Sequence, residues 1–62
     1  MMCHITATNW NGRQISETFK SDATDIAILA PRAHKELRRK GWTTYRLDSL
    51  NGKSVPYALQ YA

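Results

Sequence analysis

Three side chains in this sequence have the chemistry for nucleophilic catalysis or metal binding: Cys3, His4 and His34. A catalytic cysteine needs a histidine held against it, and a structural zinc site needs four ligands. Cys3 and His4 are neighbours in an expected strand, so their side chains point to opposite faces. His34 falls beside an apolar helical stripe, where a histidine usually packs. We therefore expect no enzyme activity, no metal and no cofactor.

The other chemically capable side chains are basic and lie in the second half of the chain. Residues 1–30 carry a net charge of −1 and residues 31–62 a net charge of +5, which gives +4 for the whole chain. Such asymmetry favours an acidic partner, either nucleic acid or an acidic protein surface. The alternative is surplus charge that serves solubility.

Most of this charge lies on one expected helix. A row at positions i, i+3 and i+7, away from the apolar stripe, is formed by Arg32, Lys35 and Arg39. Such a row can follow phosphates or an acidic protein surface. Glu36 can pair with Arg32 or Lys40 at i±4, as on an ordinary solvated helix face. The candidate partner-binding or nucleic-acid-binding residues are Arg32, Lys35, Arg38, Arg39, Arg46 and Lys53.

The chain of 62 residues is long enough for one domain, which we place at residues 1–62. A domain of this size buries only about 60% of the surface of its unfolded chain, so its core is thin. Its one cysteine can form no disulfide within the chain, as is usual in a reducing cytoplasm. The longest apolar run, residues 26–30, is far shorter than the ~20 residues of a membrane span. We expect a soluble, cytoplasmic protein without a membrane partner.

The N-terminal part has the pattern of a β-hairpin, in which Asn11-Gly12 is a strong turn signal. A two-residue turn would place the apolar side chains of the two strands on opposite faces. A three-residue loop over residues 10–12, with Gly12 in the left-handed conformation, avoids this. We predict that register, which pairs Cys3 with Phe19, Ile5 with Glu17 and Ala7 with Ile15. Glu17 is then the one charged residue on the apolar face.

The segment that follows has helical periodicity. Ser21 or Asp22 is the predicted N-cap, and Gly41 is predicted to end the helix at C′. An apolar stripe continues across Pro31, but a proline costs ~3 kcal/mol inside a helix. Three interpretations stay open: one helix kinked at Pro31, two short helices with Pro31 at the first position of the second, or a strand over residues 25–29 before a shorter helix. Ile28 would lie on the polar side of a continuous helix, which favours the break.

The C-terminal part has the pattern of a second hairpin with Asn-Gly at its turn. By the same argument, a three-residue loop over residues 50–52 is predicted between strands 43–47 and 54–59. The face towards the helix would then carry Tyr45, Leu47, Val55, Tyr57 and Leu59. Pro56 cannot donate to a strand ladder, so the last strand is predicted at an edge of the sheet.

Together these elements predict an α+β fold in one small domain. An antiparallel sheet of two β-hairpins, in the order ββαββ, packs on one kinked or broken helix. Trp10 and Trp42 are each suited to the margin of the core or to an interface, where tryptophan is enriched. We expect both to pack.

The segment from Pro31 to Leu59 resembles the recognition helix and wing of small phage and bacterial winged helix-turn-helix domains. The likeness lies in Leu37-Arg38-Arg39-Lys40-Gly41-Trp42 and then in Val55-Pro56-Tyr57-Ala58-Leu59. It implies direct DNA contact by Arg32, Lys35 and Arg39. A winged helix also has two helices upstream, where this sequence has a predicted hairpin.

The complete order of hairpin, helix and hairpin resembles small phage-encoded inhibitors, among them anti-CRISPR proteins and short inhibitors of host RNA polymerase. This resemblance is one of architecture and covers the entire chain. It implies a non-enzymatic protein that docks on a host nucleic-acid-handling complex and blocks it. We expect it to bind an acidic protein surface, or nucleic acid held in the complex, in the host cytoplasm. The alternative is a regulatory protein that binds DNA or RNA directly through residues 31–40 and the following hairpin.

Overall fold

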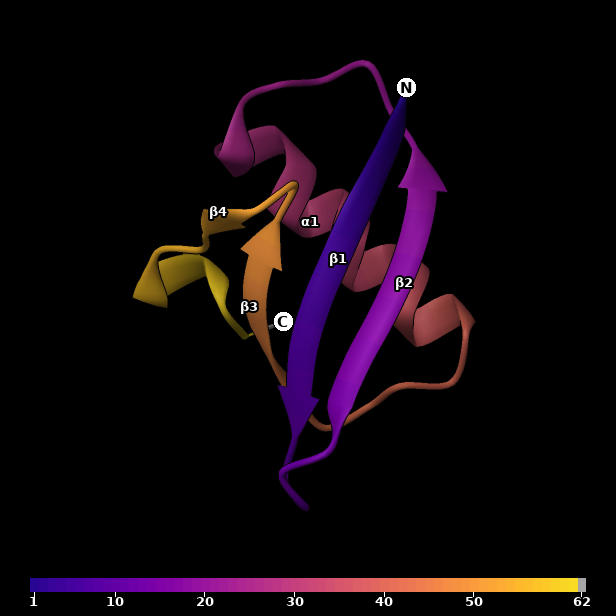
Figure 1. Ribbon diagram of the computed structural model, residues 1–62, viewed down its shortest axis with the longest axis vertical. Coiled ribbons are helices and arrows are strands. Elements are labelled where there is room, and N and C mark those ends of the chain that lie inside the picture. Colours follow the sequence, from indigo (N-terminus) through magenta and orange to yellow (C-terminus); the bar gives the residue numbers. More distant parts are fainter. Residues whose placement is uncertain (62) are drawn as a thin grey trace.

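The computed structural model describes residues 1–61, which form one antiparallel sheet with a helix on one of its faces (Figure 1). The elements are β1 (Met2–Asn9), β2 (Gln14–Lys20), α1 (Ile26–Arg39), β3 (Tyr45–Leu50), β4 (Lys53–Ser54) and the 3₁₀ helix η1 (Tyr57–Leu59). The four strands lie in the order β2-β1-β3-β4. In Figure 1, α1 passes behind β1 and β2, and no element of the described chain covers the opposite face. The predicted α+β fold with the order ββαββ is confirmed.

The first hairpin has the predicted register. Its pairs include Cys3 with Phe19, Ile5 with Glu17 and Ala7 with Ile15. Gly12 has a φ of +80°, the left-handed conformation that the three-residue loop requires. Burial alternates along β1, so that one row of its side chains lies in the core. The apolar pattern therefore predicted this hairpin correctly.

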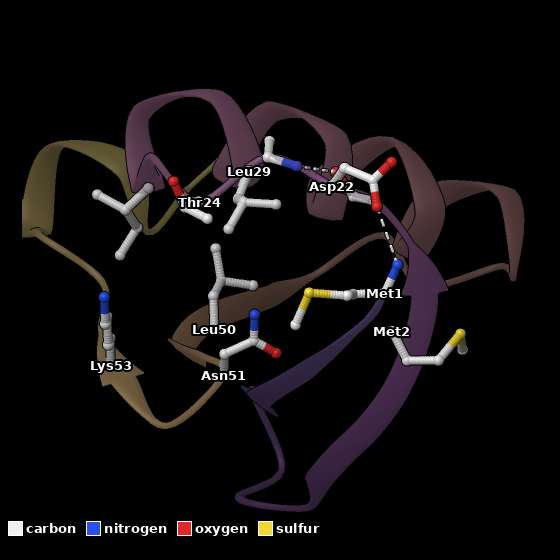
Figure 2. A pocket seen from close by; sticks show the side chains of 11 residues that line it. Met1, Met2, Asp22, Thr24, Leu29, Leu50, Asn51 and Lys53 are labelled. Atoms are coloured by element: carbon white, nitrogen blue, oxygen red, sulfur yellow. Dashed lines mark hydrogen bonds and ion pairs between the residues drawn. The ribbon is translucent and has the colours of Figure 1, made fainter.

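The helix begins later than predicted. Its N-cap is Asp25, whose Oδ1 accepts a hydrogen bond from the amide of Ala27 at 3.0 Å. Asp22, one of the two predicted N-caps, instead accepts a hydrogen bond from the amino group of Met1 at 3.0 Å (Figure 2). Ser21, the other, accepts one from the amide of Ala23. Four acidic or hydroxyl side chains lie at residues 21–25, and Asp25 is the one that caps the helix.

Replacing Asp25 by alanine should lower the free energy of unfolding by about 1 kcal/mol, because the amide of Ala27 loses its acceptor. Asp22→Ala is the matched control. Its ion pair with the N-terminus is almost fully exposed, and exposed pairs contribute little to stability. Urea unfolding of both variants measures the difference. Equal losses would show that Asp25 does not act as the cap.

Pro31 lies inside one continuous helix, so the two alternatives that interrupted the helix, a break at Pro31 and a strand over residues 25–29, are both wrong. Both Pro31 and Ala27, whose carbonyl would have accepted the missing amide, are exposed, and solvent can hydrogen-bond that carbonyl. Ile28 is 48% exposed on the polar side of the helix.

Gly41 ends the helix as predicted, at φ +97°, and the amide of Trp42 donates to the carbonyl of Leu37 at 2.9 Å.

The second hairpin differs from the prediction. Its turn has two residues, Asn51 and Gly52, both with positive φ, instead of the predicted three-residue loop. The pairing of β1 with β3 shifts between Thr6 and Ala7, which leaves Asp48 as an extra residue in β3. This bulge reverses the alternation, so Leu47 and Leu50 are both buried. Strict alternation of apolar and polar residues therefore predicted the wrong turn.

The chain also leaves the sheet earlier than predicted. β4 has only two residues, and Pro56 precedes the 3₁₀ helix η1 where a strand to Leu59 was expected. Val55 is buried as predicted, but Tyr57 is 79% exposed and does not reach the core. The position of β4 at an edge of the sheet agrees with the prediction. Proline fixes the backbone outside a ladder conformation here, which ends the strand.

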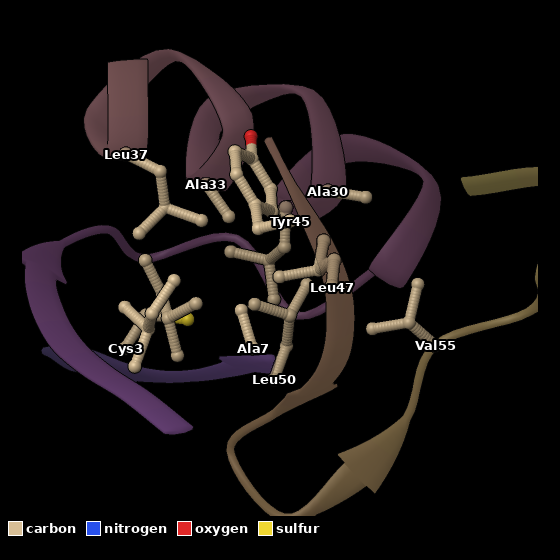
Figure 3. Packing of buried hydrophobic residues seen from close by; sticks show 12 residues of the cluster. Cys3, Ala7, Ala30, Ala33, Leu37, Tyr45, Leu47, Leu50 and Val55 are labelled. Atoms are coloured by element: carbon tan, nitrogen blue, oxygen red, sulfur yellow. The ribbon is translucent and has the colours of Figure 1, made fainter. Parts of the chain in front are cut away.

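The core lies between the sheet and the inner face of α1 (Figure 3). Its fully enclosed side chains include Ile5, Leu37, Leu47 and Leu50, with Cys3 beside them. Five partly buried hydrophobic side chains surround this cluster: Phe19, Ala23, Ile26, Trp42 and Leu59. Burial of the apolar stripe of α1 thus turns the opposite side of the helix to solvent.

Candidate functional site

The six candidate binding residues are all exposed, but they do not form one surface. Four of them lie on α1: Arg32, Lys35, Arg38 and Arg39. Arg46 lies on β3, next to two buried neighbours in sequence, and so points to the open face of the sheet. Its Nε donates to Asp48 Oδ1 at 2.8 Å. Lys53 lies at the β3–β4 turn, on the rim of a cavity near the start of α1.

One member of the predicted row is neutralised. Arg39 donates two hydrogen bonds to the carboxylate of Glu36, at 3.2 and 2.5 Å. These bonds lower the pKa of Glu36 and raise that of Arg39. Lys40 Nζ lies 3.9 Å from the same carboxylate. Of the two partners predicted for Glu36, Lys40 is near its carboxylate and Arg32 is not, and Arg39 is an additional partner. Arg32 instead donates to Ser21 Oγ at 3.2 Å.

Three cations of α1 have no carboxylate partner among residues 1–61, and one of them, Arg38, lies on the side of the helix that borders His34 and Leu59. They are Arg32, Lys35 and Arg38. Ile28 lies one turn before Arg32 on the same side, and its exposed side chain adds an apolar contact. We call Ile28, Arg32, Lys35 and Arg38 the outer basic face.

The charged residue on the apolar face of the first hairpin is held by two long-range partners. Trp42 Nε1 donates to Glu17 Oε2 at 3.1 Å, and Lys40 Nζ donates to Glu17 Oε1 at 3.2 Å. The bond from Trp42, and then that from Lys40, lower the pKa of Glu17. These contacts join the C-terminal end of α1 to β2, and they confirm that Trp42 packs.

The pairing of Glu17 predicts a loss of stability in acid. A carboxylate with a lowered pKa stabilises the fold above its ordinary value of 4.5, and this contribution disappears as the pH falls through the pKa of the folded state. Glu17→Gln should therefore lose less stability than the parent between about pH 7 and about pH 3. Urea midpoints at both pH values measure the loss, with Asp22→Asn as an exposed control. A Glu17→Gln loss as large as the parent's would contradict the prediction.

The three residues with catalytic chemistry form no hydrogen bond with one another in the described chain. Cys3 is buried, and burial raises the pKa of its thiol, which disfavours the reactive thiolate. His4 is exposed on the other side of β1. In the described part of the chain, no group of three His, Cys, Asp or Glu side chains is placed to hold a metal ion.

His34 packs in the core, as predicted from the sequence, and it is almost completely buried. It is 6% exposed, its Nδ1 lies 2.6 Å from the hydroxyl of Tyr45, and its Nε2 lies 2.8 Å from the carbonyl oxygen of Leu59. A carbonyl can only accept, so Nε2 carries a proton, and in the neutral ring the Tyr45 hydroxyl donates to Nδ1. The ring therefore ties α1 to β3 and to η1.

Sequence reasoning missed a group of exposed aromatic side chains. Trp10 was expected to pack but is 73% exposed, and Tyr57 lies 6.1 Å, centroid to centroid, from the ring of Tyr61. Trp10 and Tyr61 line a shallow groove of about 160 Å³ with Thr43, Thr44 and Tyr45. These aromatic residues come from a loop and from the segment after β4, so no periodic pattern connects them. The one local indication that Tyr57 leaves the sheet is Pro56, the residue before it.

The cavity beside the start of α1 is small. It has a volume of about 110 Å³, and its lining includes Leu29, Leu50 and the side chains of Met1 and Met2 (Figure 2). Ligand pockets for drug-sized molecules usually have volumes of about 300–1,000 Å³. The cavity suits a single inserted side chain better than a cofactor.

No helix in residues 1–61 has the length and hydropathy to cross a bilayer. Comparison of the chain with models of protein families, with curated proteins and with solved structures finds no match.

Proposed function

We propose that this protein is a non-enzymatic inhibitor that docks through its outer basic face onto an acidic protein surface of a nucleic-acid-handling complex. The class of inhibitor follows the resemblance in architecture to small phage-encoded proteins such as anti-CRISPR proteins. The host cytoplasm is the compartment where such a complex operates.

One observation carries the proposal. Arg32, Lys35 and Arg38 have no carboxylate partner in the described chain, whereas Glu36 is turned away from them towards Arg39 and Lys40. A surface designed only for solubility needs no such separation of paired and unpaired cations. The exposed Ile28 beside them supplies the apolar contact that protein interfaces bury at their centre.

Direct binding of DNA or RNA is the second candidate, and the exposed aromatic side chains favour it. Trp10 and Tyr61 line a groove, and aromatic side chains of this kind stack on unpaired bases. The outer basic face could then contact phosphates. Both candidates use the same cations, so the partner's chemistry has to be distinguished by experiment.

A matched pair of charge reversals tests the proposal. Lys35→Glu alters the outer basic face, and Lys53→Glu makes the same change in charge on β4, outside that face. Immobilised parent protein and both variants are incubated with nuclease-treated bacterial lysate, and the retained complexes are identified and titrated. We expect the first variant to bind about 10- to 100-fold more weakly, because reversed charges repel an acidic surface, and the second to bind as the parent does.

Two results would contradict docking on protein. Equal binding by both variants would mean that the outer basic face is solubility charge. Binding of labelled single-stranded or duplex DNA by the parent, with an affinity that falls steeply with rising salt, would support direct nucleic-acid binding instead.

A further inference from the structure

The two edges of the sheet differ in how their backbone groups are satisfied. On the β4 side, the amide of Val55 donates to the carbonyl of Asp48 at 3.1 Å, and the amide of Leu47 donates to the carbonyl of Gln60 at 2.9 Å. The segment after β3 therefore covers that strand along its length. β4 itself is two residues long and is followed by Pro56, which blunts this edge.

The β2 edge is open over seven residues. The bonds from Asn9 to Arg13 and from Ser21 to Met1 show that the odd-numbered residues of β2 bond to β1. Hydrogen bonding alternates along an antiparallel strand, so the even-numbered residues direct their N–H and C=O groups outward. These are Gln14, Ser16, Thr18 and Lys20, and no hydrogen bond inside residues 1–61 uses their backbone groups.

The side chains along this edge do not repel a neighbouring strand. An inward-pointing charge can protect a strand edge from pairing, but Trp42 and Lys40 already bind the carboxylate of Glu17. Phe19 is only partly buried on the helix-bearing face and offers apolar surface to an added strand. The open face of β2 carries polar side chains and ends in the ammonium group of Lys20.

Charge determines what kind of strand fits. Arg13 and Lys20 lie at the two ends of the β2 edge, and both are exposed. Two copies of this chain pairing antiparallel over the full length of β2, with Gln14 opposite Lys20, would place Glu17 of one copy opposite Glu17 of the other, and opposed like charges are destabilising. A partner strand with acidic side chains on the open face would instead place a carboxylate beside Lys20.

We propose that the β2 edge binds an extended segment of a partner protein, with alternating apolar and acidic side chains, as an added antiparallel strand. The apolar side chains pack on the helix-bearing face beside Ile15 and Phe19, and the acidic ones lie on the open face near Lys20. The backbone groups of the four even-numbered residues provide the hydrogen bonds, as in other cases of strand addition. This surface is separate from the outer basic face and does not depend on the function proposed for it.

The test uses a blocked peptide of alternating glutamate and valine, matched in length to β2, and amide hydrogen exchange measured by NMR. With the peptide at about ten times its Kd, exchange at the amides of Gln14, Ser16, Thr18 and Lys20 should slow about tenfold. A peptide with lysine in place of glutamate should protect them much less. Lys35→Glu should leave the protection unchanged, which separates this surface from the outer basic face.

A proline variant tests the backbone bonds directly. Ser16→Pro removes an outward amide without removing a β1–β2 hydrogen bond, and it should weaken peptide binding, whereas Ser16→Ala should not. If Ser16→Pro does not fold, a peptide N-methylated at the amides that face β2 replaces it and should fail to protect the parent protein.

Unchanged exchange at the four amides, or equal protection by the lysine peptide, would overturn the proposal. So would protection that appears without peptide as the protein concentration rises, because the occupant would then be a second copy of the chain.

Discussion

Replacing Leu37 by alanine should leave most molecules unfolded at room temperature. Leu37 is fully buried on the inner face of α1, near Ala33 and Tyr45 in the core (Figure 3). Such a truncation removes apolar burial and leaves a cavity, at a cost of about 2–5 kcal/mol. A single core in a chain of this size supplies only ~3–5 kcal/mol of stability. Far-ultraviolet circular dichroism and urea unfolding measure the loss.

Ile28→Ala is the matched control on the same helix, because Ile28 is 48% exposed and fills no enclosed space. Its unfolding free energy should stay within about 0.5 kcal/mol of the parent's value. The same variant should weaken docking through the outer basic face. A change in the core lowers stability, whereas Ile28→Ala should lower binding and leave stability almost unchanged. Similar unfolding of both variants would mean that α1 does not pack on the sheet through Leu37.

Replacing Tyr45 by phenylalanine should lower the free energy of unfolding by about 1–3 kcal/mol, although only a hydroxyl group is removed. That hydroxyl donates to Nδ1 of the buried His34, whose other nitrogen already donates to the carbonyl of Leu59. Without Tyr45 as donor, Nδ1 is an acceptor that has lost its partner on a side chain only 6% exposed. Urea unfolding measures the cost, and NMR shifts of η1 report on the attachment of the C-terminal segment.

Tyr57→Phe is the control for this prediction. Tyr57 is 79% exposed, its hydroxyl has no hydrogen bond in the described chain, and its removal should change stability by less than about 0.5 kcal/mol. If Tyr45→Phe were as harmless, the bond between His34 and Tyr45 would contribute nothing to the fold. If both variants were equally destabilised, the effect would come from losing a tyrosine hydroxyl in general.

The first hairpin and the end of the helix could be predicted from the sequence because local rules decide them. Parity of the apolar positions allowed one register around Asn11-Gly12, and Gly41 has the positive φ that a helix C-terminus favours. The start of the helix was less predictable, since Ser21, Asp22 and Asp25 all have side chains that can cap. Asp22 is used by the amino group of Met1, a contact that sequence periodicity does not encode.

The second hairpin could not be predicted by parity because a bulge interrupts it. Asp48 is the extra residue, and its carboxylate is held by the hydroxyl of Thr8 and by Arg46 Nε. The turn residue Asn51 exchanges hydrogen bonds with the backbone of His4 on β1. Contacts with a strand more than forty positions away in sequence therefore set this turn.

For the candidate site, the sequence by itself determined which helix carries the excess positive charge, because helical spacing separates the basic residues from the apolar stripe. Only the tertiary structure decided which of these cations remain available. Glu36 can reach several cations at helical spacing, and the position of Glu17 on β2 draws Lys40 to that side while Arg39 pairs with Glu36. The outer basic face therefore contains Arg38 and not Arg39, which belonged to the row predicted from the sequence. Ion pairs between elements depend on the distance between those elements in space, and residue spacing along one helix does not give that distance.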